Sequence, residues 1–281
     1  MRAPLVSIAM PYYNAKLTMG AAIRSVLLQT CPDWELLLCD DGSTDASGDL
    51  ARSFGDPRIV ECGDRRRLQL GERLNECIER AAGAYIARMD ADDIAYPRRL
   101  EQQLLFLAER PEVDLAGGWA VLFADGGAPV GKRADPAAHG DIARRPLHSF
   151  KLIHPTFMGK TSWFRRFRYR ADAIRCEDHD LLFRACGSSR YANLPEIVLG
   201  YRQGGIDLRK RLRSRWMWCR CAASYLNPTA RLRVGAVEIL KSCRDVLSVA
   251  ARADTSWLRS RSEALTEEEL REWRMVWNSV S

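Results

Sequence analysis

Short apolar segments alternate with segments of helical periodicity through the first half of the chain. The apolar segments have the length of buried strands and read LVSIAMP, WELLLCD, RIVEC and AYIARMD. Between the first two, apolar side chains recur at the helical spacing of Ile23, Val26 and Leu27. Strands that alternate with helices in this way predict an α/β fold, with a mostly parallel sheet flanked by helices on both faces.

Acidic residues lie at the ends of two of these predicted strands. Asp40 and Asp41 end the second segment, and Asp90, Asp92 and Asp93 lie at the end of the fourth. Ligands of open α/β sheets bind beside the carboxyl ends of the strands. We therefore expect the two acidic groups to meet at one edge of the sheet, although they are far apart in sequence.

Three carboxylates so close together repel one another unless a positive group lies among them. In an extended segment the side chains of Asp90 and Asp92 point the same way. They are therefore candidates to bind a hard divalent cation, Mn²⁺ or Mg²⁺, which takes oxygen ligands and leaves room for substrate phosphates. The alternative is that the acids cap the helix expected next, and for Asp93 we favour this capping role.

The composition is that of a globular protein with ample material for a core. Of the 281 residues, 47% are hydrophobic and 28% are charged. No run reaches the roughly 20 apolar residues that span a bilayer. The first residues lead straight into a strand-like segment without an apolar leader, so we expect a cytoplasmic protein. The nine cysteines lack paired spacing and are expected to be reduced thiols.

The second half is less regular and ends in helices. A Gly-rich turn joins a predicted strand pair, residues 128–150 are predicted as loop, and LIHPTFMG and EIVLGYR are predicted as short strands. Helical periodicity continues from Asp207 onward, and TEEE forms a capping box for the last helix. We therefore divide the chain into a domain of residues 1–206 and a helical extension of residues 207–281.

The extension is basic. Residues 207–281 contain 15 Lys and Arg against 9 Asp and Glu, which leaves +6 of the total net charge of +7 in this region. Within residues 207–220, RKRLRSRWMWCR interleaves basic and aromatic residues, a pattern that fits an anionic membrane surface. The alternative is that Leu208, Leu212 and Trp216 pack on the domain while the arginines are solvated. A second apolar stripe consists of Leu232, Ala236, Ile239, Leu240, Cys243, Val246, Leu247 and Ala250.

An ordered set of motifs covers the chain from residue 4 to residue 202, about 70% of its length. The motifs are VSIAMPYYN, SVLLQTCPDWELLLCDDGSTD, LNECIERAAGAYIARMDADD, PRRLEQQ, IHPTFM, CEDHDLLFRACG and LPEIVLGYR. The set resembles the family 2 glycosyltransferases with the GT-A fold, of the bacterial surface-polysaccharide type. A lone DxD motif is weak evidence, whereas seven motifs in order are specific.

The resemblance implies a binding site for a nucleotide-diphosphate sugar. In such enzymes the end of the first strand and the acidic pair after the second contact the nucleotide, and further residues close the pocket. Carried over to this chain, the donor-binding residues are Pro11, Tyr13, Asn14, Asp40, Asp41, Asn75, Arg88 and Asp90. Asp41 is our choice for the contact to the base, whereas a loop role is an equal alternative for Asp40. The DxD motif implies a Mn²⁺ or Mg²⁺ ion on Asp90 and Asp92.

Inverting sugar transfer needs a carboxylate that takes the proton of the acceptor hydroxyl. In the family this base lies in a Glu-Asp pair that opens a helix, and we assign it to Asp178, with Asp180 as the rival and helix capping as the alternative for both. His154 lies in a motif on the acceptor side, although a lone His is more often structural, and His179 is expected to face away from the site. The family's His after the YR of the last strand is absent, so no metal ligand is implied from that side.

The sequence therefore predicts an inverting, metal-dependent glycosyltransferase that uses a nucleotide-diphosphate sugar, with UDP as the expected carrier. The acceptor is a hydroxyl of a glycan or lipid-linked glycan in polysaccharide, lipopolysaccharide or capsule biosynthesis, at the inner face of the membrane. A nucleotidyltransferase, one alternative, needs a Gly-rich basic loop after the first strand, and PYYNAKLTMG is not one. A non-enzymatic polyanion-binding protein leaves the acidic motifs unexplained, because such acids repel nucleic acid.

Overall fold

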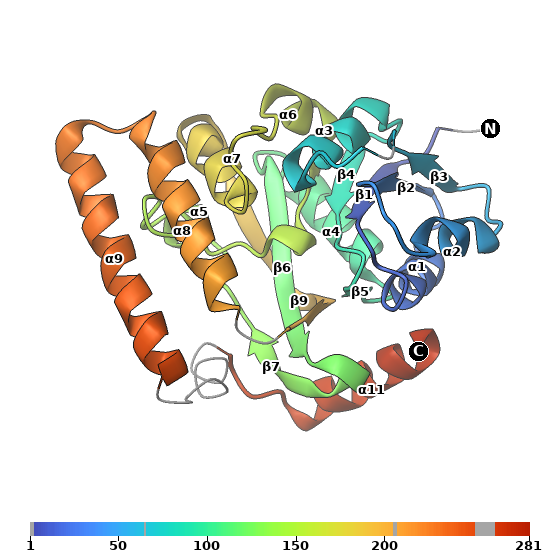
Figure 1. Ribbon diagram of the computed structural model, residues 1–281. Coiled ribbons are helices and arrows are strands. Elements are labelled where there is room, and N and C mark those ends of the chain that lie inside the picture. Colours follow the sequence, from blue (N-terminus) through green and yellow to red (C-terminus); the bar gives the residue numbers. More distant parts are fainter. Residues whose placement is uncertain (1–2, 65, 205–206, 251–261) are drawn as a thin grey trace.

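One sheet of nine strands organises the protein in the computed structural model, which describes residues 3–64, 66–204, 207–250 and 262–281. The strand order is β3-β2-β1-β4-β8-β6-β9-β5, and β7 pairs with β6. Helices cover both faces of this sheet (Figure 1). The predicted α/β architecture is therefore confirmed.

The first four strands form a parallel sheet, as the alternating pattern predicted. They are β1 (Val6–Tyr12), β2 (Trp34–Asp40), β3 (Ile59–Cys62) and β4 (Tyr85–Arg88). The helices that connect them are α1 (Met19–Leu27), α2 (Ser47–Ser53) and α3 (Leu70–Arg80). Strand β1 pairs with both β2 and β4, and β2 pairs with β3, in parallel throughout. The carboxyl ends of β1, β2 and β4 therefore share one edge, where the acidic groups lie.

Antiparallel pairings enter with the second half, so that the complete sheet is mixed. The elements that follow β4 are β5 (Ile94–Ala95), α4 (Arg99–Glu109), β6 (Leu115–Phe123), β7 (Pro129–Arg133), α5 (His139–Ile142), β8 (Met158–Lys160), α6 (Thr161–Arg166), α7 (Glu177–Ala185) and β9 (Tyr191–Arg202). Strand β8 is antiparallel to β4 and β6, β7 to β6, and β5 to β9, whereas β6 and β9 are parallel. Residues 128–150, predicted as loop, contain β7 and the short helix α5.

The core has two layers, one on each face of the sheet, because side chains alternate along each strand. Ile8 and Met10 of β1 pack with α1 and α4 on one face. Ala9 of β1 and Leu37 and Cys39 of β2 pack with α3, α6 and α7 on the other face. Both layers are apolar, and their packing holds in place the strand ends that carry the acids.

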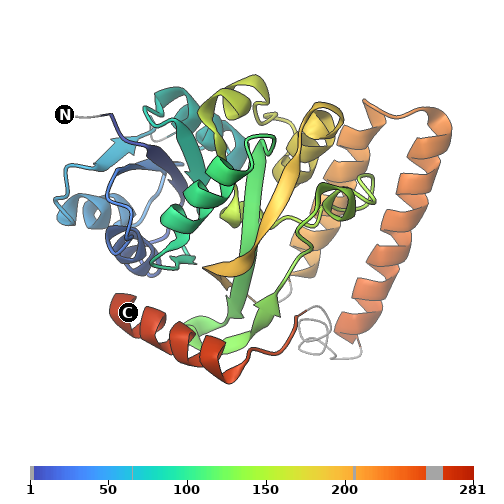
Figure 2. The same ribbon diagram turned by 180° about the vertical axis from the view of Figure 1, so that it is seen from behind.

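The helical extension contains α8 (Leu208–Ala223), α9 (Pro228–Ala250) and α11 (Glu267–Val280). The predicted capping box at Thr266 and Glu269 is present at the start of α11. Helix α11 packs on the sheet through Trp273 and Val276, which join a cluster with residues of β5 and β6 (Figure 2). Its last turn also accepts a 2.6 Å hydrogen bond from Arg24 Nε of α1 to the carbonyl of Val280. A chain division at residues 206 and 207 stays a prediction.

The apolar stripes predicted for α8 and α9 do not form the core. On α8 the buried apolar side chains are Met217, Trp218, Cys221 and Ala222, whereas Trp216 is 59% exposed. On α9 the predicted stripe faces outward, with Leu232, Ile239, Leu240, Val246 and Leu247 all exposed; the side chain of Ala250 lies outside the described residues. Periodicity identified the apolar face of α9, and the structure shows that this face is exposed.

Candidate active site

A cleft of about 350 Å³ opens at the carboxyl ends of β1 and β2. Its walls come from these strand ends, the loop before α3, the segment before α7, and helix α8. The lining residues are Pro11, Tyr12, Tyr13, Asp41, Arg67, Gln69, Leu70, Arg73, Ile174, Arg175, Glu177 and Ser214. Three of the predicted donor-binding residues, Pro11, Tyr13 and Asp41, are therefore in the cleft. The arginines and Glu177 were not predicted as site residues, although a run of arginines directly after a strand was visible in the sequence.

Asp41 holds the loop that forms one wall of the cleft. Its Oδ1 accepts hydrogen bonds from the backbone N of Leu68 at 2.7 Å, from the backbone N of Gln69 at 3.2 Å and from Arg73 Nε at 3.2 Å. Its Oδ2 is paired with Arg67, whose guanidinium lies 3.6 Å from the centre of the Tyr13 ring. The guanidinium of Arg67, stacked on the ring of Tyr13, thus borders the cleft beside Asp41.

Asp40 and Asn14 shape the loop after β2. Asp40 Oδ1 accepts a hydrogen bond from the backbone N of Ser43 at 2.8 Å. Asn14, with a positive φ of 48°, accepts a hydrogen bond from the backbone N of Thr44 at 2.8 Å. For Asp40 this is the loop role that stood as its alternative, and neither residue lines the cleft among the described residues. Their donor contacts stay predictions.

The acidic group after β4 contains its own counterion. Arg88 is 3% exposed and donates two hydrogen bonds to Asp90, to Oδ2 at 2.7 Å and to Oδ1 at 2.6 Å. Carboxylate oxygens of Asp90, Asp92 and Asp93 all lie within 4.8 Å of one another. Arg88 therefore pairs with Asp90, one of the three acids whose carboxylates converge here.

The other two carboxylates lack a comparable partner. Burial, followed by the charge of Asp90, raises the pKa of Asp92 to about 6. The same two causes raise the pKa of Asp93 well above its usual value. Asp93 Oδ1 accepts a 2.9 Å hydrogen bond from the backbone N of Arg202, but its buried Oδ2 has no hydrogen-bond partner among the described residues. An unpartnered carboxylate oxygen facing two further carboxylates fits a hard divalent cation.

The predicted capping role of Asp93 is wrong. Helix α4 begins at Arg99, and Arg98 occupies its N-cap. The two-residue strand β5 lies between Asp93 and that helix and pairs with β9, so Asp93 turns inward toward the backbone of Arg202. The sequence of β5 is too short to be recognised as a strand by periodicity.

Tyr169 connects the acidic group to the region of the predicted base. Asn75 Nδ2 donates to the carbonyl of Tyr169 at 2.8 Å, and Asn75 Oδ1 accepts from its backbone N at 3.0 Å. The hydroxyl of Tyr169 lies 2.9 Å from His154 Nε2. Burial and the charge of Arg88 keep the pKa of His154 well below its usual range, so this imidazole stays neutral. Asn75 and His154 thus fix Tyr169, and neither lines the cleft.

The charges near Tyr169 bring the two acidic regions together. Burial raises the pKa of Tyr169, Arg88 opposes this rise, and the charges of Asp178, Glu177 and Asp90 add to it. Asp90 at the end of β4 and Asp178 on α7 therefore lie within electrostatic reach of one hydroxyl. The pKa of Tyr169 thus responds to residues of both predicted sites, that of the metal and that of the base.

The three acids at the start of α7 have different surroundings. Glu177 is 8% exposed, lines the cleft and accepts a 2.9 Å hydrogen bond from the backbone N of Arg175, and burial raises its pKa. Asp180 is fully buried and accepts from Arg184 Nε and from the hydroxyl of Tyr225, both at 2.8 Å. Asp178 is partly exposed and makes no side-chain hydrogen bond or ion pair within the described part of the chain.

His179 faces away from the cleft, as expected. Its ring stacks on Trp218 of α8 with a centroid separation of 3.6 Å, and its Nε2 lies 2.7 Å from the carbonyl of Pro146. Of the groups on the first turn of α7, Asp178 is thus the carboxylate whose oxygens are not engaged by a side chain or a turn. Asp180, in contrast, is held in a structural network.

Comparisons with known proteins identify the family. The family model described as "Glycosyl transferase family 2" matches residues 7–171. The chain is 33% identical over 217 residues, 74% of its length and 76% of the relative's, to the putative glycosyltransferase EpsE of Bacillus subtilis (strain 168). It is 36% identical over 118 residues, 42% of its length and 47% of the relative's, to the UDP-Glc:alpha-D-GlcNAc-diphosphoundecaprenol beta-1,3-glucosyltransferase WfgD of Escherichia coli.

Two solved structures share the fold. TarS residues 1–349 of S. aureus in complex with UDP-GlcNAc has a TM-score of 0.62 at 16% identity, covering 98% of this chain and 81% of that one. The mannosyltransferase PcManGT from Pyrobaculum calidifontis in complex with GDP-Man and Mn²⁺ has a TM-score of 0.59 at 16% identity, covering 100% of this chain and 86% of that one. The chain belongs to glycosyltransferase family 2 and is a glycosyltransferase with the GT-A fold.

Proposed function

We propose that this enzyme transfers a sugar, with inversion, from a UDP-linked donor to a hydroxyl of a glycan or lipid-linked glycan in surface-polysaccharide biosynthesis. The cleft bordered by Tyr13, Arg67 and Asp41 takes the nucleotide, because an aromatic ring, a guanidinium and a carboxylate suit a base and its polar edge. Relatives whose names describe glycosyltransferases of this kind support the proposal.

The observation that carries the proposal is the acidic group after β4. Asp90 and Asp92 would hold a Mn²⁺ or Mg²⁺ ion, and the partnerless Oδ2 of Asp93 faces the same group. When bound, such an ion neutralises charge that develops on the leaving diphosphate. Arg88 orients Asp90 through its two hydrogen bonds, so that the carboxylate is positioned before the ligand arrives.

Asp178 is the proposed base. A hydroxyl is a poor nucleophile, and a carboxylate with free oxygens takes its proton as the bond to the anomeric carbon forms. Asp178 meets this requirement because no described side chain engages it, and Tyr169 links its surroundings electrostatically to Asp90. Glu177 at the wall of the cleft orients the start of α7 through its hydrogen bond to the backbone N of Arg175.

A donor screen by nucleotide release tests this proposal. Purified enzyme is incubated with Mn²⁺ and UDP- or GDP-linked sugars, with Asp92→Asn and Asp178→Asn as variants and Arg98→Gln, exposed on the opposite side of β5, as the control. We expect release with a UDP-sugar that both variants reduce by about 100-fold or more while they remain folded. Full activity of Asp178→Asn would remove the base assignment, and activity without any divalent ion would remove the metal.

The lipid-linked acceptor raises the question of how the enzyme approaches a membrane. The name of the relative WfgD describes an acceptor on diphosphoundecaprenol, a membrane lipid carrier. No helix in the described part of this chain is both long and apolar enough to cross a bilayer. We propose a peripheral attachment through the extension, which is the basic part of the molecule.

Helix α9 provides the attachment surface in this proposal. Its apolar residues are exposed, with Leu232 at 75%, Leu240 at 69% and Leu247 at 68%, whereas its acids Glu238 and Asp245 are buried. A surface helix of a globular protein has the opposite arrangement, with its apolar side chains buried and its charged side chains exposed. The exposed arginines 231, 233 and 244 flank the apolar stripe, which matches an anionic bilayer with its headgroups beside the acyl region.

Some of residues 207–220, which were first predicted for membrane contact, instead form ion pairs with α9. Arg215 of α8 donates to Asp245 of α9 at 2.6 Å and lies 3.6 Å from Glu238. Arg211 also pairs with Asp245, at 3.4 Å. These arginines fasten α9 with its acids inward, so α8 acts in this proposal chiefly by turning the apolar stripe outward.

Vesicle flotation tests the attachment surface. We expect the enzyme to float with vesicles that contain phosphatidylglycerol, to bind pure phosphatidylcholine weakly, and to lose binding about tenfold or more in Leu240→Glu/Leu247→Glu. Leu17→Glu/Leu105→Glu is the control because these leucines, 96% and 56% exposed, lie elsewhere on the surface. Unchanged binding of the α9 variant would overturn the assignment, as would a wild-type dimer in sedimentation velocity that the same variant dissociates.

A further inference from the structure

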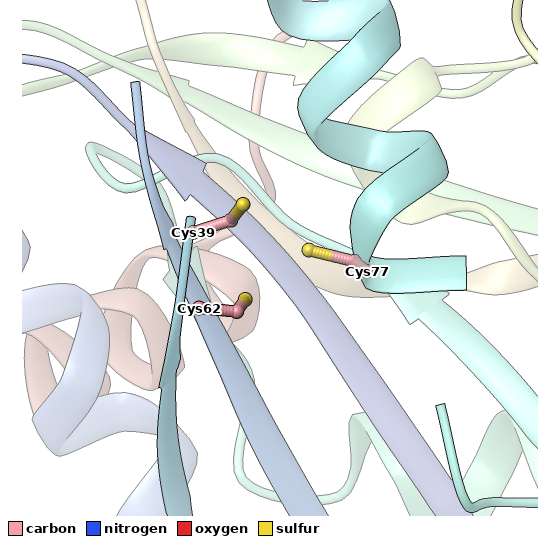
Figure 3. A group of neighbouring side chains, drawn as sticks. All are labelled: Cys39, Cys62 and Cys77. Atoms are coloured by element: carbon pink, nitrogen blue, oxygen red, sulfur yellow. The ribbon is translucent and has the colours of Figure 1, made fainter. Parts of the chain in front are cut away.

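Three buried thiols converge on the face of the sheet that α3 covers. Cys39 lies on β2, Cys62 on β3 and Cys77 on α3, and their side chains point toward one another (Figure 3). All three Sγ atoms lie within 4.8 Å of one another. Cys39 and Cys77 are fully buried and Cys62 is 6% exposed. All nine cysteines of the chain are free thiols, so this cluster holds no disulfide.

The sheet register places the first two thiols side by side. Cys39 and Cys62 are partners in the parallel pairing of β2 with β3, so their side chains project from the same face. The Sγ atom of Cys77, on α3, lies 3.9 Å from the carbonyl oxygen of Leu37. Leu37 is two residues before Cys39 on β2. Three separate elements thus contribute one sulfur each, which is how protein metal sites tie segments together.

The surroundings of the thiols are charged. Glu76 Oε2 lies 3.3 Å from Cys39 Sγ and also accepts a 2.7 Å hydrogen bond from the fully buried Arg73. Arg80 lies 3.5 Å from the other carboxylate oxygen of Glu76. A cluster of three thiolates and a carboxylate around a dication carries an excess of negative charge, and two arginines beside it offset that excess.

We propose that Cys39, Cys62 and Cys77 bind one Zn²⁺ ion, with Glu76 as the fourth ligand. Zinc is held by thiolates and carboxylates in tetrahedral sites, and soft sulfur ligands select it over the hard ions suited to Asp90 and Asp92. Binding replaces the S–H protons, which leave to solvent, and the ion keeps its oxidation state. With Zn–S bonds of about 2.3 Å the sulfurs sit about 3.8 Å apart, so small rotations of these side chains suffice.

The position of Cys62 favours loading of this site. Cys62 ends β3, an edge strand of the sheet, and its slight exposure gives an ion a path from solvent. The ion would hold β2, β3 and α3 together directly beneath Asp41, since Arg73 bonds to both Glu76 and Asp41.

Metal content tests the site. The full-length enzyme, purified under reducing conditions without a metal-binding tag, should contain about one zinc per chain by mass spectrometry. Cys62→Ser should reduce this to below about one fifth. Substitution of Co²⁺ should give the intense thiolate-to-metal absorption band of a sulfur-rich site, and the band should be lost in the same variant. Circular dichroism confirms that Cys62→Ser, the least buried position, is folded.

Two controls separate this site from the proposed catalytic ion. Cys176→Ala removes one member of another buried thiol pair, with Cys221 at 3.8 Å between sulfurs, and should leave zinc content unchanged. Asp92→Asn should also leave zinc content unchanged, because the donor-binding metal is a different ion. Wild-type protein that lacks zinc and shows no sulfur-to-cobalt band on titration would overturn the proposal, as would full zinc content in Cys62→Ser. Either result leaves the proposed transferase activity untouched.

Discussion

Two groups of buried acids in this molecule are treated in opposite ways. At the interface of α8 and α9, Glu238 and Asp245 face Arg215 and Lys241 at distances of 2.5–3.6 Å. At the end of β4, Asp90, Asp92 and Asp93 converge on one another, and among the described residues the side chain of Arg88 is hydrogen-bonded to Asp90 alone. The first group is neutralised by the protein's own basic side chains. In the second group the pKa values of Asp92 and Asp93 are raised, which fits the cation site that we propose there.

The same contrast occurs within one helical turn of α7. Asp180 is buried and bound by Arg184 and Tyr225, whereas Asp178 is partly exposed and engaged by no described side chain. A carboxylate whose partners belong to the protein supports the fold, and a carboxylate without them is available for chemistry. Pairing by the protein's own groups therefore separates structural acids from candidate functional ones better than burial does.

The largest expected effect comes from replacing each of these two aspartates, in turn, with asparagine. Asp178→Asn should lower kcat by about 100- to 10,000-fold with little change in Tm, because it removes a proton acceptor and no structural bond. Asp180→Asn should lower Tm clearly and leave the kcat of the folded fraction within a few-fold, since it weakens the bonds to Arg184 and Tyr225. Nucleotide-release kinetics and differential scanning fluorimetry distinguish the two. The reverse pattern would make Asp180 the base.

The second effect concerns the neutralised group. Arg215→Met removes the nearest ion-pair partner of Asp245 and a more distant partner of Glu238, and should cost about 3 kcal/mol of unfolding free energy. Arg213→Met, on the exposed side of the same helix, is the matched control and should cost little. Urea unfolding measures both. A small cost for Arg215→Met would show that the α8–α9 interface does not depend on this pairing.

The third effect is a pH dependence that the unneutralised group imposes. Asp92 has a pKa of about 6 in the fold against 3.8 when unfolded, so the folded state binds its proton more tightly. Its stabilising contribution is present below pH 3.8 and is lost as pH rises through 6, by roughly 2 kcal/mol in the metal-free enzyme. Asp92→Asn should remove this loss, and Mn²⁺ should reduce it in the wild type. Urea unfolding between pH 4 and 7.5 provides the measurement, and an equal slope in Asp92→Asn would contradict the assignment.

Much of the sheet was predictable because its signals are local. The runs of apolar residues marked β1, β2 and β4, and the rule that ligands bind at strand ends located the acidic groups without a structure. The capping box of α11 was equally local. The metal role followed from the spacing of Asp90 and Asp92 and was reinforced by the family resemblance, whereas the assignment of the base to Asp178 followed from the resemblance; both remain predictions.

What could not be predicted depends on contacts between distant segments. Helical periodicity identified the apolar stripe of α9, but its direction is set by Arg215 of α8, which binds the acids on the other side. Arg73 of α3 was not predicted as a site residue, and it is fully buried and joins Asp41, Asp64 and Glu76. Charged residues that are buried by partners far away in sequence carry no periodic signal.

The smallest effect tests a predicted donor contact against a structural one. Asn75→Ala removes both hydrogen bonds to the backbone of Tyr169 and should lower stability by about 1–2 kcal/mol. Asn75→Asp keeps the bond accepted from the backbone N of Tyr169 and should lose less. If Asn75 instead contacts the donor, both variants raise the KM for the nucleotide-sugar. A raised KM with unchanged Tm would return Asn75 to the group of ligand-binding residues. A lower Tm with unchanged KM would make Asn75 a support for Tyr169, whose hydroxyl responds to the charges of both Asp90 and Asp178.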